Sequence, residues 1–292
     1  MRLGVVFPQT EIGNDPAVIR DYAQAAEGAG YDHLLVFDHV LGSTLERLDK
    51  LGRRPPYTDQ SSFHEPFVLF GFLAAATRRV GLVTGIVILP QRQTALVAKQ
   101  AAAVDVLSGG RLRLGVGVGW NPVEFEALGE DFHTRGRRVE EQVQVMRALW
   151  TKELVTFTGA YHRIPDAGLN PLPVQRPIPV WMGGESEVVQ RRMARVADGW
   201  MPHFRPGPAS QEIVDRMHAM VREGGRDPKV FGIEGRMALP QIPPSDWGRE
   251  LEAWQAMRGI THLCVHTAGM GLKSPGDHVQ TLRRFREAVG LK

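Results

Sequence analysis

His39 is the side chain of this sequence best suited to proton transfer, and it follows Asp38 directly after a run of apolar residues. That run, 33–37 (HLLVF), predicts a buried strand, so the pair stands at a strand end. Histidine is the commonest general acid or base because it titrates near neutrality. The plainer alternative is a helix cap followed by a surface histidine. We favour a catalytic role for His39, with Asp38 beside it at the same strand end, because further candidate sites follow other predicted strands.

A second candidate site lies in residues 111–124 (RLRLGVGVGWNPVE), where a predicted strand opens into glycines. The spacing G-x-G-x-G lacks the last glycine of the dinucleotide fingerprint, and the helix expected next is delayed by about a dozen residues. A Rossmann turn is therefore not expected. Tight packing inside a barrel is the plain explanation for Gly115 and Gly117. Three side chains beyond the strand are expected to face a ligand: Trp120, Asn121 and Glu124.

A third candidate site follows the strand predicted at 178–182 (IPVWM). Four residues there form a glycine-rich turn that opens a helix: Gly183, Gly184, Glu185 and Ser186. Free backbone N–H groups and the helix dipole favour an anion at such a turn, and glycine lets a phosphate approach closely. The Glu185 carboxylate would repel an anion, so its side chain is expected to point away. The alternative is a simple connection between strand and helix.

The elements that must position these side chains form an alternating series of strands and helices. Apolar runs predict eight strands, at 2–7, 33–37, 80–89, from 112, at 178–182, 199–202, 230–239 and 260–266. Strands that are apolar throughout are buried on both faces, and helices between them indicate parallel connections. We therefore expect an α/β fold, a (β/α)8 TIM barrel formed as a single domain over 1–292. A doubly wound sheet is the alternative.

Two long segments interrupt the alternation and are expected to be insertions after strands 2 and 4. Residues 40–62 are polar and rich in glycine and proline, and 152–177 combine a short hairpin around Gly159 with a proline-rich passage. Connections of this length are often functional lids. We expect both segments to shape the substrate pocket.

Composition excludes several classes of function. The chain has 292 residues and a net charge of +3, with acidic and basic residues interspersed, so nucleic acid is not an expected partner. The single cysteine, Cys264, permits no disulfide within the chain, and neither a signal peptide nor a membrane span is evident, so we expect a cytoplasmic protein without a membrane partner. No metal site is expected, because no H-E-x-x-H or Cys/His ligand set occurs. A G-x-S-x-G nucleophile motif is also missing.

Four motifs in sequence order resemble the bacterial luciferase-like monooxygenase superfamily, and within it the branch of oxidoreductases that use the deazaflavin coenzyme F420. They are AEGAGYDHLLVFDHVLG, VGLVTGIVILP, AKQAAAVDVLSGGRLRLGVGVGWNPVEFEALG and PVWMGGES with RVADGW. The resemblance covers residues 2–39, 64–151 and 177–202, which make up most of the chain. It implies a (β/α)8 barrel, usually a homodimer, with the cofactor lying across the carboxyl ends of the strands.

The resemblance also implies roles for particular residues. His39 matches the histidine near the reactive ring, and Gly85-Ile86 matches a place where relatives often carry a non-prolyl cis peptide against the deazaflavin. Gly183 and Gly184 match the phosphate-binding turn. The pocket loop is matched by Trp120, Asn121 and Glu124. In one departure, Trp120 stands where the branch that oxidises sugar phosphates has a catalytic acid, which argues against that chemistry.

The expected activity is therefore hydride transfer between coenzyme F420 and a small organic molecule whose identity the sequence does not specify, with His39 supplying or accepting the proton. An FMN-dependent monooxygenase that inserts oxygen from O2 is the alternative. A third hypothesis is a barrel that binds flavin without turnover. The intact His39 and the glycine turn argue against that third hypothesis.

Overall fold

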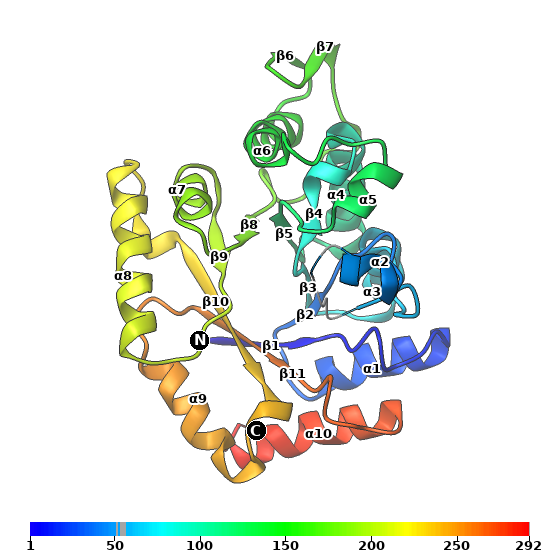
Figure 1. Ribbon diagram of the computed structural model, residues 1–292, viewed down its shortest axis with the longest axis vertical. Helices are drawn as coiled ribbons and strands as arrows, with labels where there is room; N and C mark the ends of the chain where they lie inside the picture. Colours follow the sequence, from blue (N-terminus) through cyan, green and yellow to red (C-terminus); the bar gives the residue numbers. More distant parts are fainter. Residues whose placement is uncertain (51, 53–56, 292) are drawn as a thin grey trace.

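The computed structural model describes residues 1–50, 52 and 57–291, and its parallel strands lie inside a ring of helices (Figure 1). The strands are β1 (Arg2–Val6), β2 (His33–Val36), β3 (Gly81–Thr84), β4 (Val87–Ile88), β5 (Leu112–Gly117), β6 (Val155–Thr158), β7 (Arg163–Ala167), β8 (Val180–Gly183), β9 (Gly199–Met201), β10 (Gly232–Ala238) and β11 (His262–His266). The α-helices are α1 (Pro16–Gly28), α2 (Leu45–Lys50), α3 (Pro66–Ala76), α4 (Thr94–Ser108), α5 (Pro122–Ala127), α6 (Arg135–Thr151), α7 (Glu187–Val196), α8 (Pro208–Glu223), α9 (Trp247–Ala256) and α10 (Pro275–Ala288). Four short 3-10 helices are η1 (Leu89–Gln91), η2 (Pro228–Val230), η3 (Leu239–Gln241) and η4 (Pro244–Asp246).

The parallel strands close into a barrel. Their order is β3-β2-β1-β11-β10-β9-β8-β5-β4, and an additional pairing joins β3 to β5. Residues Gly85 and Ile86 divide the third barrel position into β3 and β4, both of which pair with β5. The closed sheet confirms the predicted (β/α)8 barrel, and a doubly wound sheet, which stays open, is wrong.

The strands form because their side chains are apolar on both faces. Outward-facing residues pack under the helices in one large core. Inside the barrel a second, smaller core is formed by Val6, Leu35, Val83, Trp181, Met201 and Cys264, with Phe37 and Ile86 packed on it. Cys264 is 1% exposed, as expected for a small buried apolar residue. This inner core supports the floor of the pocket described below.

The first expected insertion contains a helix that the sequence did not predict, and the second contains the predicted hairpin. In 40–62 the helix α2 follows β2, and residues 51 and 53–56 lie outside the described residues. In 152–177 the antiparallel hairpin β6–β7 surrounds Gly159 and projects beyond α6 (Figure 1). Glu141 of α6 holds the hairpin by accepting hydrogen bonds from the Ala160 and Tyr161 amides.

The helix α5 is a correction to the sequence-based prediction, which placed 119–124 in a loop and the next helix about a dozen residues later. The structure starts α5 at Pro122, directly after Asn121. Asn121 caps the helix, and Pro122 needs no amide partner at the first helical position. Within the residues that the structure describes, no helix has both the length and the apolar character needed to cross a membrane.

Candidate active site

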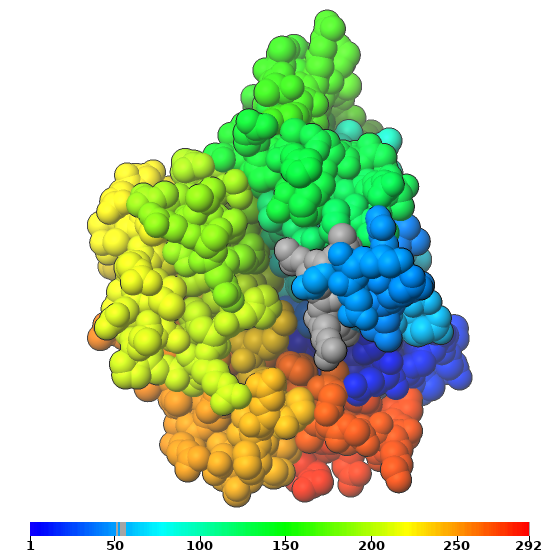
Figure 2. Space-filling model, viewed as in Figure 1, coloured from blue at the N-terminus to red at the C-terminus, as the bar shows by residue number. Residues whose placement is uncertain are grey.

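A pocket of about 450 Å³ opens at the carboxyl ends of the barrel strands. One wall carries His39, Tyr57 and Trp120, and another carries His203, Arg236 and His266. Phe37 and Ile86, which pack on the inner core, also line the pocket. Figure 2 shows the surface furrowed between the yellow-green part of the chain near residue 200 and the blue and green parts opposite. In a (β/α)8 barrel, this end of the strands is where active sites form.

His39 lines this pocket, as the sequence predicts, and its side chain is 15% exposed. Its ring stacks on Tyr57, with 3.5 Å between centroids and 27° between planes, and Phe63 meets it edge-on at 5.0 Å. The Nδ1 atom lies 3.5 Å from Oε2 of Glu124. His39 is thus held between aromatic rings, with one ring nitrogen facing a carboxylate.

Asp38 is 3% exposed and fastens the neighbouring strand end. Its Oδ2 accepts the Ile88 amide hydrogen at 3.0 Å, and its Oδ1 accepts a hydrogen bond from Arg92 at 2.8 Å. Burial raises the pKa of Asp38, and the Arg92 guanidinium opposes that rise. Because both oxygens have protein partners, the structure gives Asp38 a positioning role beside the pocket.

Gly85 and Ile86 both line the pocket, and the peptide between them is cis, as the resemblance implied. The Ile86 side chain leaves no room for larger neighbours: a Cβ on Gly117 would lie 2.5 Å from it, and one on Gly183 would lie 3.3 Å from it. Similarly, a Cβ on Gly115 would lie 2.0 Å from the Thr84 carbonyl oxygen. The packing explanation for Gly115 and Gly117 is therefore confirmed.

The pocket-loop prediction is corrected for two of its three residues. Trp120 lines the pocket, but Asn121 is 1% exposed and Glu124 is fully buried. Both turn away from the pocket because α5 begins directly after Asn121. Both also contact Tyr57: Asn121 Nδ2 donates a hydrogen bond to the Tyr57 hydroxyl at 3.3 Å, and that hydroxyl donates one to Glu124 at 3.2 Å. They support the pocket wall from behind.

The glycine-rich turn borders a second pocket of about 530 Å³ through Glu185, whereas Gly183, Gly184 and Ser186 line neither pocket. Gly184 has a φ of +124°, and the side chain of Ser186 makes no capping hydrogen bond to the first turn of α7. Glu185 is exposed and lines the second pocket, where its Oε1 accepts the His203 amide hydrogen at 3.0 Å. His203 lines both pockets, so they are neighbours.

Comparison with known proteins shows to which family the chain belongs. The model of the luciferase-like monooxygenase family matches residues 1–239. The chain belongs to the luciferase-like monooxygenase family. An uncharacterized protein of Mycobacterium tuberculosis is 37% identical over 299 residues, which cover 98% of this chain and 99% of the relative.

Both coenzymes considered from the sequence occur among proteins similar to this luciferase-like chain. The FMNH(2)-dependent dimethylsulfone monooxygenase of Pseudomonas putida is 32% identical over 171 residues, which cover 57% of this chain and 47% of the relative. The solved structure of an F420-dependent secondary alcohol dehydrogenase in complex with an F420-acetone adduct has a TM-score of 0.76 and 20% identity, covering 99% of this chain and 98% of that one.

Several pocket residues of this luciferase-like protein were not found from the sequence. Tyr57 and Phe63 belong to the long segment after β2, whose path no periodicity reveals. Arg236 and His266 lie on β10 and at the end of β11, and His203 follows β9. A polar residue at the carboxyl end of an apolar strand was the available signal, and it was used only for the second, fourth and fifth strands.

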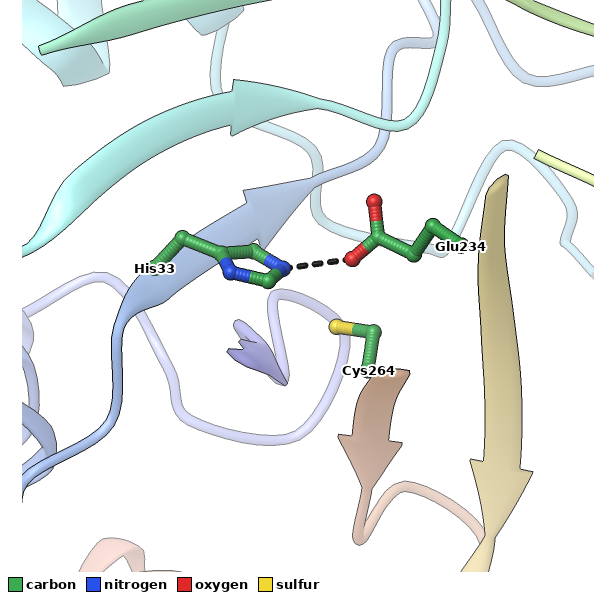
Figure 3. Close-up of side chains that lie close together, drawn as sticks. All are labelled: His33, Glu234 and Cys264. Carbon is green, nitrogen blue, oxygen red and sulfur yellow. Dashed lines mark hydrogen bonds and ion pairs between the residues drawn. The ribbon is translucent and has the colours of Figure 1, made fainter. Parts of the chain in front are cut away.

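A buried polar cluster lies inside the barrel, formed by residues of β2, β10 and β11 that do not line the pocket (Figure 3). His33, Glu234 and Cys264 point toward one another, and their donor atoms lie within 4.8 Å. Both carboxylate oxygens of Glu234 have partners, His33 at 2.5 Å and Arg113 at 2.7 Å. Burial raises the pKa of Cys264, which disfavours the thiolate that binds metals. With Arg113 already supplying the positive charge, the cluster is suited to an internal ion pair and not to a cation.

The residues of the first pocket fit a flavin-type ring. Aromatic and aliphatic side chains predominate, with a few polar groups among them, as in most cofactor sites. Gln9 lines the pocket and is 2% exposed, yet its Oε1 has no hydrogen-bond partner among the described residues. A buried acceptor is expected to be paired, and the pyrimidine edge common to flavins and deazaflavins carries an N–H donor.

Proposed function

We propose that this protein is an oxidoreductase that exchanges a hydride between the deazaflavin coenzyme F420 and a small organic substrate. One observation carries the proposal: His39, backed by the buried Glu124 carboxylate, lines the pocket at the carboxyl ends of the strands. Hydride exchange with an alcohol or carbonyl group needs a proton acceptor or donor at the reacting group, and histidine serves well. The sequence motifs that resemble the F420-dependent branch support this choice of coenzyme.

The chain's own residues would hold the cofactor at two places. The apolar and aromatic walls of the first pocket and Gln9 would hold its ring, and the turn formed by Gly183, Gly184, Glu185 and Ser186 would hold its phosphate through the free amides of α7. Gly85 and Ile86 would lie against the ring. When bound, the deazaflavin supplies a ring carbon that gives or accepts the hydride.

An FMN-dependent monooxygenase is the second candidate function. Its specific support is the 32% identity to the FMNH(2)-dependent dimethylsulfone monooxygenase, over 57% of this chain. The same pocket and the same glycine-rich turn would serve FMN, which also carries a phosphate. The coenzyme therefore decides between the two functions.

The deciding experiment is a titration of the protein with each coenzyme, followed by quenching of tryptophan fluorescence, since Trp120 lines the pocket. Submicromolar binding of F420 with no binding of FMN supports the proposal. Binding of FMN alone, together with oxygen consumption driven by NADH and a flavin reductase, overturns it in favour of the second candidate. Binding of neither coenzyme overturns both.

We also propose that the protein forms a homodimer through α3 and α4. Helix α3 (PFVLFGFLAAA) is apolar on every face, yet Val68 is 72% and Phe72 42% exposed. On α4, which packs beside α3, Leu96 is 51% exposed. A helix that is apolar all round is normally buried, and an exposed apolar patch of this kind marks an interaction surface.

A further inference from the structure

Glu124 connects α5 to the long segment that follows β2. The residue is fully buried, and both of its carboxylate oxygens contact that segment. Oε1 accepts the amide hydrogens of Val40 at 2.9 Å and Leu41 at 3.2 Å. Oε2 accepts the Tyr57 hydroxyl hydrogen and faces Nδ1 of His39 at 3.5 Å. The two oxygens therefore have different partners.

The carboxylate stays ionised in this environment. Burial acts to raise the pKa of Glu124, but His39 and the Leu41 and Val40 amides outweigh it, and the pKa is lowered. An ionised carboxylate only accepts hydrogen bonds. Nδ1 of His39 is buried and forms no regular hydrogen bond with the described residues, and the atom that it faces, at 3.5 Å, is this acceptor. We therefore take Nδ1 as the nitrogen that carries the hydrogen.

The His39 ring has little freedom to turn out of this arrangement. Tyr57 stacks on one face, and Phe63 meets the ring edge-on. Asp38, the other nearby carboxylate, has both oxygens engaged by the Ile88 amide and Arg92. With Nδ1 facing Glu124 at 3.5 Å, Nε2 is the nitrogen left to serve a ligand in the pocket.

We propose that Glu124 is a positioning residue, which fixes His39 as the Nδ1–H tautomer and presents an unprotonated Nε2 to the pocket. Nε2 can then accept the proton that leaves a substrate hydroxyl, and the resulting imidazolium faces the Glu124 carboxylate. In the reverse direction the same nitrogen returns the proton. This inference rests on the proposed function for the use of the proton, but the tautomer itself does not depend on any cofactor.

The isosteric variant Glu124→Gln tests the tautomer directly. The amide oxygen of glutamine can keep the Val40 and Leu41 hydrogen bonds, so its NH2 group replaces Oε2 and points a donor at His39. Nδ1 must then become an acceptor, and the hydrogen moves to Nε2. Long-range 1H–15N spectra separate protonated from bare ring nitrogens, and a His39→Asn spectrum identifies His39 among the ten histidines.

The spectra are recorded on the protein without cofactor at about pH 8.5, well above the ordinary pKa of a histidine side chain. The expected result is a protonated Nδ1 in the wild type and a protonated Nε2 in Glu124→Gln. The control variant Tyr57→Phe removes one hydroxyl from the same oxygen while keeping the stacked ring, and it should leave the wild-type tautomer unchanged. An unprotonated Nδ1 of His39 in the wild type overturns the inference. A Glu124→Gln variant that keeps the wild-type tautomer also overturns it.

A kinetic comparison separates this inference from the proposed function. Glu124→Gln should lower turnover by ~10²–10⁴, as expected for a general base in the wrong tautomer, while the coenzyme Kd stays close to the wild-type value. A changed tautomer with unchanged turnover overturns the positioning role. Failure of the wild-type protein to bind either coenzyme contradicts the proposed function and leaves the tautomer result standing.

Discussion

Asp38 and Glu124 are buried carboxylates on either side of His39, and their surroundings give them different tasks. Burial raises the pKa of Asp38, whose oxygens hold the Ile88 amide and Arg92. The pKa of Glu124 is lowered because His39 and two amides outweigh burial. Asp38 thus fixes the backbone beside the pocket, and Glu124 fixes the ring that faces into it.

The first prediction concerns His39 itself. His39→Ala should lower turnover by ~10²–10⁴ and leave coenzyme affinity largely intact, because it removes the proton acceptor while Tyr57 and Trp120 still form that wall of the pocket. The measurement follows coenzyme absorbance with the best substrate from a screen of small alcohols and carbonyl compounds. His133→Ala, which alters an exposed histidine, is the control and should change neither quantity. Equal loss of turnover and affinity would show that His39 is a binding group.

Among the secondary-structure elements, α5 matters most for the site although it is only six residues long. Asn121 accepts the Val123 amide hydrogen at 3.1 Å and donates to Tyr57, so one side chain both starts the helix and contacts the segment after β2. The helix in turn places Glu124 behind His39. Its cap is therefore coupled to the geometry of the pocket.

The second prediction compares two helix caps. Asn121→Ala and Ser274→Ala each remove an N-cap hydrogen bond, from α5 and from the distant α10, and each should lower the free energy of unfolding by about 1 kcal/mol. Only Asn121→Ala should also weaken coenzyme binding, by up to about tenfold. Denaturant unfolding and coenzyme titration provide the two measurements. Equal affinities in the two variants would mean that the α5 cap acts on stability alone.

The whole molecule carries charged groups inside the barrel that make its stability depend on pH. Burial and the Arg113 charge lower the pKa of His262 to about 3, so the ring stays neutral in the folded state. For Glu234, burial acts to raise the pKa, but Arg113 and His33 outweigh it and lower the pKa to about 2. In both cases the unfolded chain takes up protons at a higher pH than the folded one.

The third prediction follows from these two shifts. The stabilising contribution of these two groups is fully present above about pH 6.5. It falls toward pH 3, because in that range His262 takes up a proton only in the unfolded chain. Glu234 adds to the loss of stability below about pH 4.5. Each group contributes about 1.4 kcal/mol per pH unit within its window. Urea unfolding at several pH values measures the slope. His262→Asn should reduce the slope above pH 4.5, while His266, whose pKa burial lowers to about 4, keeps part of it. An unchanged slope would assign the loss to other groups.

The fourth prediction concerns assembly. If the protein forms the proposed homodimer, replacing Val68 and Phe72 with aspartate should convert it to a monomer, because charges would be placed on the apolar surface of α3. Light scattering coupled to size-exclusion chromatography measures the mass. Val230→Asp is the control, since Val230 is 77% exposed in η2, on another part of the molecule. A monomeric wild type would contradict the proposed dimer.

Sequence patterns predicted the barrel well and the site only partly. All eight barrel strands lie where apolar runs place them, and His39 lines the pocket from the end of the second strand. The predicted loop at 119–124 is wrong because the Asn121-Pro122 pair, a recognised helix start, was passed over. Glu124 was assigned to the pocket lining on that mistaken basis.

By itself, the sequence determined the order of the elements, the α/β class and the strand end that carries His39. These follow from apolar periodicity, which each segment carries locally because it must bury its own faces. Only the tertiary structure decided that Glu124, Tyr57 and His39 meet, since hydrogen bonds between distant residues depend on barrel closure and on the path of the loops. The pairing that defines the chemistry of His39 is therefore a property of the folded molecule.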